Sequence, residues 1–367
     1  MARRQRALLL LSVNFLALFA IDRVFGAFYP AYPPYLNKKT HSWDSYASDP
    51  RGYFRDTLVD AEGRRYFTID RSKERDRRYE SSGADPAAFQ VVAVGDSFTF
   101  GQGVRLEDVW VKRLERMVGP DSRKVQGIDL AVGGANIREV FAQVKNELAK
   151  YKPSLVIYGY VLNDPIASPS PGRKMASMEM NAALNDSHDN GLGWDFINVR
   201  GPAIRSLRPA PLRWLGSCSR IVDFALSVLE RRRLSSGTIE YYRELHDPAI
   251  NGPGLQKTFD LIREMKELVE SRKSRFLVAI FPIFYEVDRD YPFRDVHRYI
   301  AERLRGIGVE SVDLLPPLSR YPTDRLWVHP TDQHPNELAH AVVADELHDW
   351  IMRQFRLGRA PGLLHND

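Results

Sequence analysis

The chain has 367 residues, of which 44% are hydrophobic and 27% are charged, and its formal net charge is +5. These values are ordinary for a globular protein with one large domain and an appendage, and they exclude a fibrous or wholly disordered chain. No Lys/Arg tract is interleaved with aromatic residues, which argues against a nucleic-acid partner. Cys218 is the only cysteine, so an intrachain disulfide and a cysteine metal cluster are both excluded.

Residues 1–28 are predicted to be a signal-anchor or a signal peptide. Three arginines within the first six residues precede an apolar run from Ala7 to Ile21, which Asp22 and Arg23 close. A basic flank before such a run keeps the N-terminus on the cytoplasmic side and directs the following chain across the membrane. We expect a membrane-anchored protein with an extracytoplasmic, periplasmic body, or a secreted one if cleavage follows Gly26. A buried N-terminal helix of a protein that is not exported is the alternative.

Residues 29–88 are predicted to form a stalk and an N-terminal extension. Pro30, Pro33 and Pro34 exclude a helix at its start, because proline lacks the amide proton that a helix interior needs. The alternating stretch 66–69 indicates a strand of an edge hairpin.

Residues 89–355 alternate between short apolar runs and helical patterns, and residues 356–367 form a tail. Strands are predicted at 89–94, 127–132, 155–161, 276–281 and 309–315. Helices are predicted at 109–118, 136–150, 255–273 and 294–306. Continuous apolar strands alternating with helices are typical of a doubly wound α/β domain. We therefore predict a flavodoxin-like, five-stranded parallel sheet with helices on both faces, whose ligands bind at the carboxyl ends of the strands.

Residues 165–250 interrupt the alternation between the third and fourth strands. Within them, residues 211–234 have the apolar spacing of an amphipathic helix. Such an insertion can form a lid over the strand ends. The alternative is a helix that only packs on the core.

The first predicted strand runs directly into Gly95, Asp96 and Ser97. A serine at the point where a buried strand ends is held at the rim of the sheet, where its hydroxyl can meet a substrate. Ser97 is therefore a candidate nucleophile, provided that a base and an oxyanion stabiliser lie nearby. The alternative is that Ser97 caps the next helix.

Two further candidates follow the second and third strands. Gly133 and Gly134 precede a helix, and glycine there lets a backbone N–H approach a ligand closely. Asn163, at the end of the third strand, carries an amide that can donate to a developing oxyanion. A tight turn at the glycines and an ordinary loop opening at Asn163 are the alternatives.

A histidine-rich segment follows the fifth strand. Asp332 and His334 stand two residues apart on a loop restrained by prolines, so the carboxylate can orient the imidazole. His329 and His340 are alternative bases. Because no second cluster with ligand spacing accompanies them, we predict no metal site.

Taken in chain order, these four blocks resemble the SGNH, or GDSL, hydrolase family, across roughly residues 89–350. The resemblance implies that Ser97 is the nucleophile and that His334 is the general base, supported by Asp332. It also implies an oxyanion hole made of the Ser97 and Gly134 N–H groups and the Asn163 amide.

The chain departs from the family pattern at two places. Val161 stands where the third block usually has glycine, and Thr331 stands where the last block usually has its aspartate, three residues before the histidine. Asp332 is two residues before His334 instead. This Asp-x-His spacing resembles the branch that includes membrane-linked polysaccharide O-acetylation proteins.

The sequence therefore predicts a serine esterase, without a cofactor, that acts on acyl or O-acetyl esters of a lipid or a glycan. One alternative is an O-acyltransferase, in which a hydroxyl of an extracytoplasmic polysaccharide replaces water as the acceptor. The other alternative is a catalytically inactive glycan-binding or scaffold protein. The expected partners are the ester substrate and, through the N-terminal segment, a membrane. The oligomeric state is open.

Overall fold

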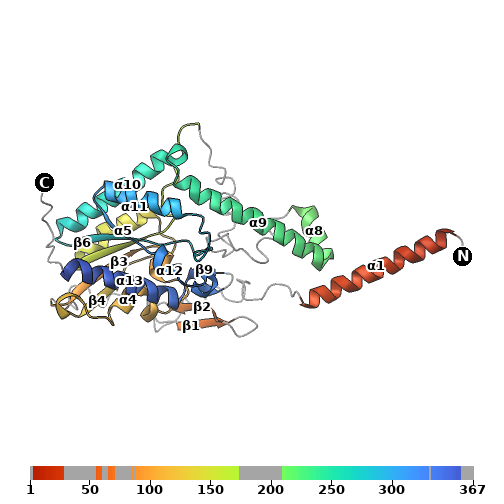
Figure 1. Ribbon diagram of the computed structural model, residues 1–367, viewed down its shortest axis with the longest axis horizontal. Helices are drawn as coiled ribbons and strands as arrows, with labels where there is room; N and C mark the ends of the chain where they lie inside the picture. The colour runs from red at the N-terminus through yellow and green to blue at the C-terminus, as the bar shows by residue number, and fades with distance from the viewer. Residues whose placement is uncertain are drawn as a thin grey trace.

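The computed structural model describes residues 3–28, 55–59, 65–70, 85, 87–172, 209–329 and 332–356 (Figure 1). The predicted stalk at 29–50 and the tail at 357–367 lie outside these residues. The helix α1 (Arg3–Phe28) covers the predicted targeting segment. No helix within the described part of the chain is long and apolar enough to cross a bilayer.

A five-stranded parallel sheet forms the centre of the body. Its strands are β3 (Phe89–Gly95), β4 (Val125–Asp129), β5 (Leu155–Tyr160), β6 (Arg275–Ile280) and β7 (Glu310–Asp313). They lie in the order β4-β3-β5-β6-β7, with every neighbouring pair parallel. This is the predicted flavodoxin-like order, and all residues of β3, β4 and β5 are buried, as the continuous apolar runs require.

Helices cover both faces of the sheet (Figure 1). One face carries α5 (Ile137–Glu147), α10 (Pro248–Ser271) and α11 (Arg294–Gly306), and the other carries α4 (Trp110–Leu114) and α13 (Glu337–Arg356). The short helices α3 (Ser97–Phe100) and α12 (Leu315–Leu318) follow β3 and β7. The predicted helix at 294–306 is confirmed residue for residue. The helix predicted at 109–118 is shorter in the structure, where it covers Trp110–Leu114. The spacing of apolar residues does not show at which residue a helix ends.

Two small hairpins complete the body. The strands β1 (Arg55–Val59) and β2 (Arg65–Asp70) pair antiparallel, so the hairpin predicted around residues 66–69 is confirmed. A second hairpin joins β8 (Trp327–His329) to β9 (Asp332–Pro335). The sequence did not predict this second pair because proline-rich polar segments normally form loops.

The described part of the insertion is a pair of helices, α8 (Ala210–Cys218) and α9 (Arg220–Leu245). The prediction of one helix at 211–234 was wrong in the number of helices and in where the helical segment ends. Ser219 ends α8 and caps α9, and α9 continues to Leu245. The Ser219 hydroxyl accepts a hydrogen bond from the Val222 N–H. In Figure 1, α9 projects from the body and carries α8 at its far end, beside α1. The lid stays a prediction, since residues 173–208 lie outside the described structure.

Glycines make the turn after β3 possible. Gly95 on β3 is the register partner of Gly159 on β5. A side chain at Gly159 would collide with Thr99 Oγ1, and one at Gly95 would stand 2.5 Å from the same atom. The two glycines therefore allow α3 to fold back tightly against the sheet, which fixes the position of Ser97.

Candidate active site

Ser97 is the first residue of α3, directly after the carboxyl end of β3. Asp96, not Ser97, caps the helix: its Oδ1 accepts a hydrogen bond of 2.9 Å from the Phe98 N–H. Gly101 ends the short helix with a φ of 74°, and its N–H donates to the Ser97 carbonyl. Because the capping role is taken by its neighbour, the Ser97 hydroxyl is available for another partner.

That partner is His334, 237 positions further along the chain on β9. Its Nε2 lies 3.0 Å from Ser97 Oγ, a distance at which the hydroxyl can donate to the neutral imidazole. Both side chains are largely buried, with 6% of Ser97 and 4% of His334 exposed. The structure therefore brings together the two residues predicted as nucleophile and base.

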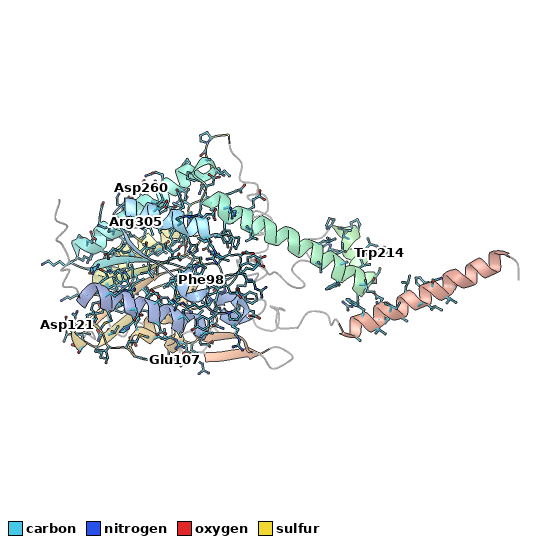
Figure 2. All side chains as sticks on the ribbon, viewed as in Figure 1. Phe98, Glu107, Asp121, Trp214, Asp260 and Arg305 are labelled. Carbon is cyan, nitrogen blue, oxygen red and sulfur yellow. The ribbon has the colours of Figure 1, made fainter. Side chains whose placement is uncertain are left out.

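Aromatic side chains surround this pair on one side. Phe98, labelled in Figure 2, has its ring centroid 5.5 Å from that of His334 and stacks on Phe284 at 5.9 Å. Phe281, after β6, meets Phe98 edge-on. The sequence prediction missed these three residues, because aromatic residues at strand ends are far more often ordinary core than part of a site. Phe98 thus packs against the imidazole, and Phe281 and Phe284 pack against Phe98.

The other predicted histidines and Asp332 have different outcomes. Asp332 begins β9, but its side chain, like that of His329, lies outside the described structure, so its orienting role stays a prediction. His340 lies on α13, is fully buried, and stands 3.3 Å from where a side chain on Gly101 would begin. Within the described residues, no three His, Cys, Asp or Glu side chains are placed to hold a metal ion.

The loop after β4 carries the two candidate glycines. Gly134 has a φ of 78°, a conformation that glycine adopts readily, whereas Gly133 does not have a positive φ. The Ala135 N–H donates to the Val132 carbonyl across this turn, and the Val132 N–H donates to the Gly95 carbonyl at 3.1 Å. This last bond places the glycine turn next to the strand end that carries Ser97.

Asn163 stands on the opposite side of Ser97, after β5. Its Oδ1 is buried and has no hydrogen-bond partner among the described residues. Since the strand order is β4-β3-β5, the predicted oxyanion residues Gly134 and Asn163 flank the nucleophile at the two neighbouring strand ends. The order in which strands are added to the sheet reverses between β3 and β5. Doubly wound folds bind their ligands at this switch point.

Asp164, which the sequence prediction did not assign, holds the Asn163 turn. Its Oδ2 accepts hydrogen bonds from the Tyr158 hydroxyl at 2.7 Å and the Val161 N–H at 2.9 Å. Burial raises the pKa of Asp164 well above its usual range, and the nearby Asp96 charge raises it further. Its position next to Asn163 was the only sequence feature that could have drawn attention to Asp164. The sequence alone does not show that its carboxyl group points into the protein.

Another buried histidine anchors the end of α9 to the sheet. His246 Nε2 lies 2.9 Å from the Tyr160 hydroxyl, and its Nδ1 lies 2.8 Å from the Tyr242 carbonyl. Burial lowers the pKa of His246 from 6.5 to about 4, because the charged imidazolium is poorly solvated there. The ring is therefore neutral near pH 7.

The low pKa of His246 predicts acid sensitivity. Between pH 6.5 and about 4 the unfolded chain binds a proton at this residue and the folded chain does not, so the stability contributed at higher pH is lost as the pH falls. The full shift corresponds to about 3 kcal/mol. We expect the free energy of unfolding of His246→Gln to approach or exceed that of the parent as the pH falls through this window, measured by urea titration. A constant difference at all pH values would contradict the assignment.

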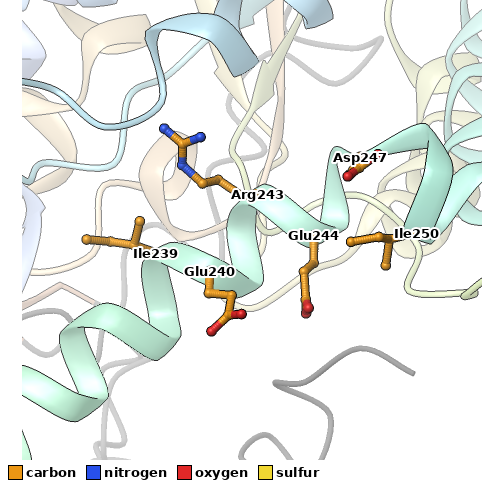
Figure 3. Close-up of a pocket in the computed structure, with 6 residues that line it drawn as sticks. All are labelled: Ile239, Glu240, Arg243, Glu244, Asp247 and Ile250. Atoms are coloured by element: carbon orange, nitrogen blue, oxygen red, sulfur yellow. The ribbon is translucent and has the colours of Figure 1, made fainter. Parts of the chain in front are cut away.

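A pocket elsewhere on the molecule is separate from Ser97. It lies at the junction of α9 and α10 and is drawn in Figure 3. Its lining residues are Ile239, Glu240, Arg243, Glu244, Asp247 and Ile250. None of the predicted site residues contributes to it.

Comparisons with solved structures found distant similarities. A lipolytic protein of the G-D-S-L family from Veillonella parvula is 11% identical, with a TM-score of 0.36, covering 71% of this chain and 97% of the other. A GDSL-like lipase from Bacteroides thetaiotaomicron is 11% identical, with a TM-score of 0.38, covering 77% and 98%. A psychrotrophic esterase from Pseudoalteromonas sp., in a structure inhibited by monoethylphosphonate, is 11% identical, with a TM-score of 0.40, covering 73% and 99%.

The comparison with curated proteins found no match. The family comparison, in contrast, matched residues 93–342, which span the sheet from β3 to α13 and include Ser97, Gly134, Asn163 and His334. This match covers more than half of the chain. The chain therefore belongs to the GDSL-like lipase/acylhydrolase family.

Proposed function

We propose that this protein cleaves ester bonds with Ser97 as the nucleophile and His334 as the general base. The observation that supports this proposal most strongly is the distance of 3.0 Å between His334 Nε2 and Ser97 Oγ. Membership of an acylhydrolase family supports ester hydrolysis in general. The substrate class that fits best is an acyl or O-acetyl ester of a lipid or a glycan.

The proposed reaction has two halves. Ser97 Oγ attacks the acyl carbonyl while His334 Nε2 takes the hydroxyl proton, and the alcohol leaves with that proton as the acyl-enzyme forms. Water then attacks the acyl-enzyme and gives a proton to His334, which passes that proton to Ser97 Oγ as the acid is released. The Ser97 and Gly134 N–H groups and the Asn163 amide would stabilise the oxyanion in both halves, and Asp332 would orient the imidazole.

A fluorophosphonate probe tests the nucleophile directly. Because the hydroxyl of Ser97 is activated by the neighbouring imidazole, we expect one probe molecule to attach per chain, at the peptide containing Ser97, as read by mass spectrometry. Ser97→Ala is the matched control and should stay unlabelled. Labelling at another serine, or none at all in the parent protein, would contradict the proposal and favour the inactive-scaffold alternative.

We further propose that the body is extracytoplasmic and that α1 holds it at the membrane. The support is the arginine-rich start followed by an apolar run, which is typical of an export segment. A C-terminal alkaline phosphatase fusion in a bacterial host should be active, because that enzyme folds only outside the cytoplasm. An inactive but full-length fusion would contradict export.

A further inference from the structure

The far end of α9 exposes an unusual number of large apolar side chains. Trp214 is 65% exposed and Leu229 is 63% exposed. We call the exposed apolar residues of α8 and the first half of α9 the apolar strip: Leu212, Trp214, Leu215, Ile221, Val222 and Leu229. Figure 2 shows Trp214 at the end of the molecule that lies next to α1, away from the sheet. Contiguous exposed apolar surface of this kind marks an interaction site.

Helix α1 packs against the start of α9, close to the apolar strip in the chain. Phe25 of α1 packs edge-on against Phe224 of α9, with ring centroids 5.6 Å apart. The side chain of Arg220 lies against Gly26, whose missing Cβ allows that close approach. On α1 itself Phe15, Leu16 and Leu18 are among the exposed apolar residues. The two helices therefore pack together near the start of α9, and each exposes apolar side chains.

A polar contact fixes this arrangement. Asp22 accepts hydrogen bonds from the Ser219 hydroxyl at 2.6 Å and from the Ile221 N–H at 3.0 Å, so its carboxylate caps the start of α9. These bonds hold the pKa of Asp22 below its usual range. The only acidic residue of α1 is thus used to attach α1 to α9.

The exposed charges around the apolar strip, within residues 12–27 and 209–229, are positive. Within residues 12–27 and 209–229, the acidic residues Asp22 and Asp223 are both buried, at 6% exposure each. Arg213 is exposed and Arg220 is half-buried. Arg23 is exposed although its guanidinium pairs with Asp22 Oδ2 at 2.6 Å. An apolar surface with a basic rim complements one that is apolar inside and anionic outside. A phospholipid bilayer has this character.

We propose that the apolar strip binds the surface of an anionic phospholipid bilayer, with α8 lying in the headgroup region beside α1. Trp214 fits this position because the indole ring combines apolar faces with an N–H that headgroups can accept. The arginines meet lipid phosphates. This contact is separate from ester cleavage at Ser97, and it gives the protein a second lipid attachment besides α1.

The single cysteine offers a local probe of this contact. Cys218 is exposed at the end of α8 and can carry the fluorophore NBD, whose emission moves to the blue in an apolar environment. We expect that shift when the labelled full chain is mixed with vesicles of phosphatidylcholine and phosphatidylglycerol, together with quenching by spin-labelled lipid. The matched control is Cys218→Ser combined with Ser271→Cys, which moves the label to the end of α10; its emission should not change.

A variant separates the apolar strip from α1. Trp214→Glu combined with Leu215→Glu places two negative charges on α8, and we expect the quenching at Cys218 to fall about tenfold or more. Cosedimentation with the vesicles through α1 should persist. Turnover of a water-soluble ester should also persist, which shows that the body is folded and keeps this test distinct from that of Ser97.

Two outcomes would overturn the proposal. If the emission of NBD at Cys218 does not change with vesicles while the protein cosediments with them, α1 alone makes the lipid contact. If the blue shift occurs without lipid and grows with protein concentration, the apolar strip binds a second copy of the chain.

Discussion

Replacing Ser97 by alanine is expected to lower kcat/KM for a short-acyl chromogenic ester by about 10⁴-fold or more, because no acyl-enzyme can form. Alanine fits at the first position of α3 without strain, and Asp96 still caps the helix. The thermal unfolding midpoint should therefore stay near that of the parent protein. The measurement is initial-rate kinetics combined with a thermal melt of the same sample.

Ser271→Ala is the matched control for this variant, since Ser271 is an exposed serine that bonds only to the Leu268 carbonyl of its own helix. It should retain full turnover. Turnover by Ser97→Ala within tenfold of the parent would remove the serine mechanism, even with every other residue in place.

Replacing His334 by alanine is expected to cause a loss of similar size, again about 10⁴-fold. Without the imidazole, the Ser97 hydroxyl has no base 3.0 Å away to take its proton. Because the two residues act as one unit, the variant that lacks both should be no slower than either single variant. Kinetics of the three variants on one ester, and the rate of fluorophosphonate attachment to the His334 variant, measure this.

His348→Ala serves as the control histidine, since its Nε2 lies 2.9 Å from the Val118 carbonyl in an exposed contact that involves no residue of the proposed site. Losses that multiply in the double variant would mean that Ser97 and His334 act independently. That outcome would contradict the proposed general base.

Much of the body could be predicted because its signals are local. Runs such as Val91–Val94 are apolar without interruption, and only a parallel sheet covered on both faces buries such runs completely. The predicted parallel strands also put Ser97 and Asn163 at the carboxyl ends of strands, and hence at one edge of the sheet. The histidines after the fifth strand were candidate bases, and the resemblance to the SGNH family selected His334 among them.

The parts that escaped prediction depend on contacts between distant segments. Nothing in the sequence near Ser219 indicates that Asp22, 197 positions earlier, bonds to it. The inward turn of Asp164 depends on a tyrosine hydroxyl from β5, and the packing of Phe98 depends on Phe284 from the loop after β6. Propensity describes single segments, and these pairs arise only when the tertiary structure forms.

The length of helix α9 determines how far the catalytic edge of the sheet can lie from the apolar strip. Its 26 residues extend roughly 39 Å at about 1.5 Å per residue. One end is capped by Asp22 of α1, and the other end is tied to Tyr160 of β5 through His246, close to Asn163. With the apolar strip at a bilayer, α9 acts as a strut that holds the catalytic edge at a height of up to that length. If α9 stands upright on the bilayer, an ester bond at headgroup level would lie out of reach of Ser97, whereas a polymer that extends from the surface into water would pass within reach. The length of one helix would in this way favour cleavage of glycan esters over cleavage of the esters of intact bilayer lipids.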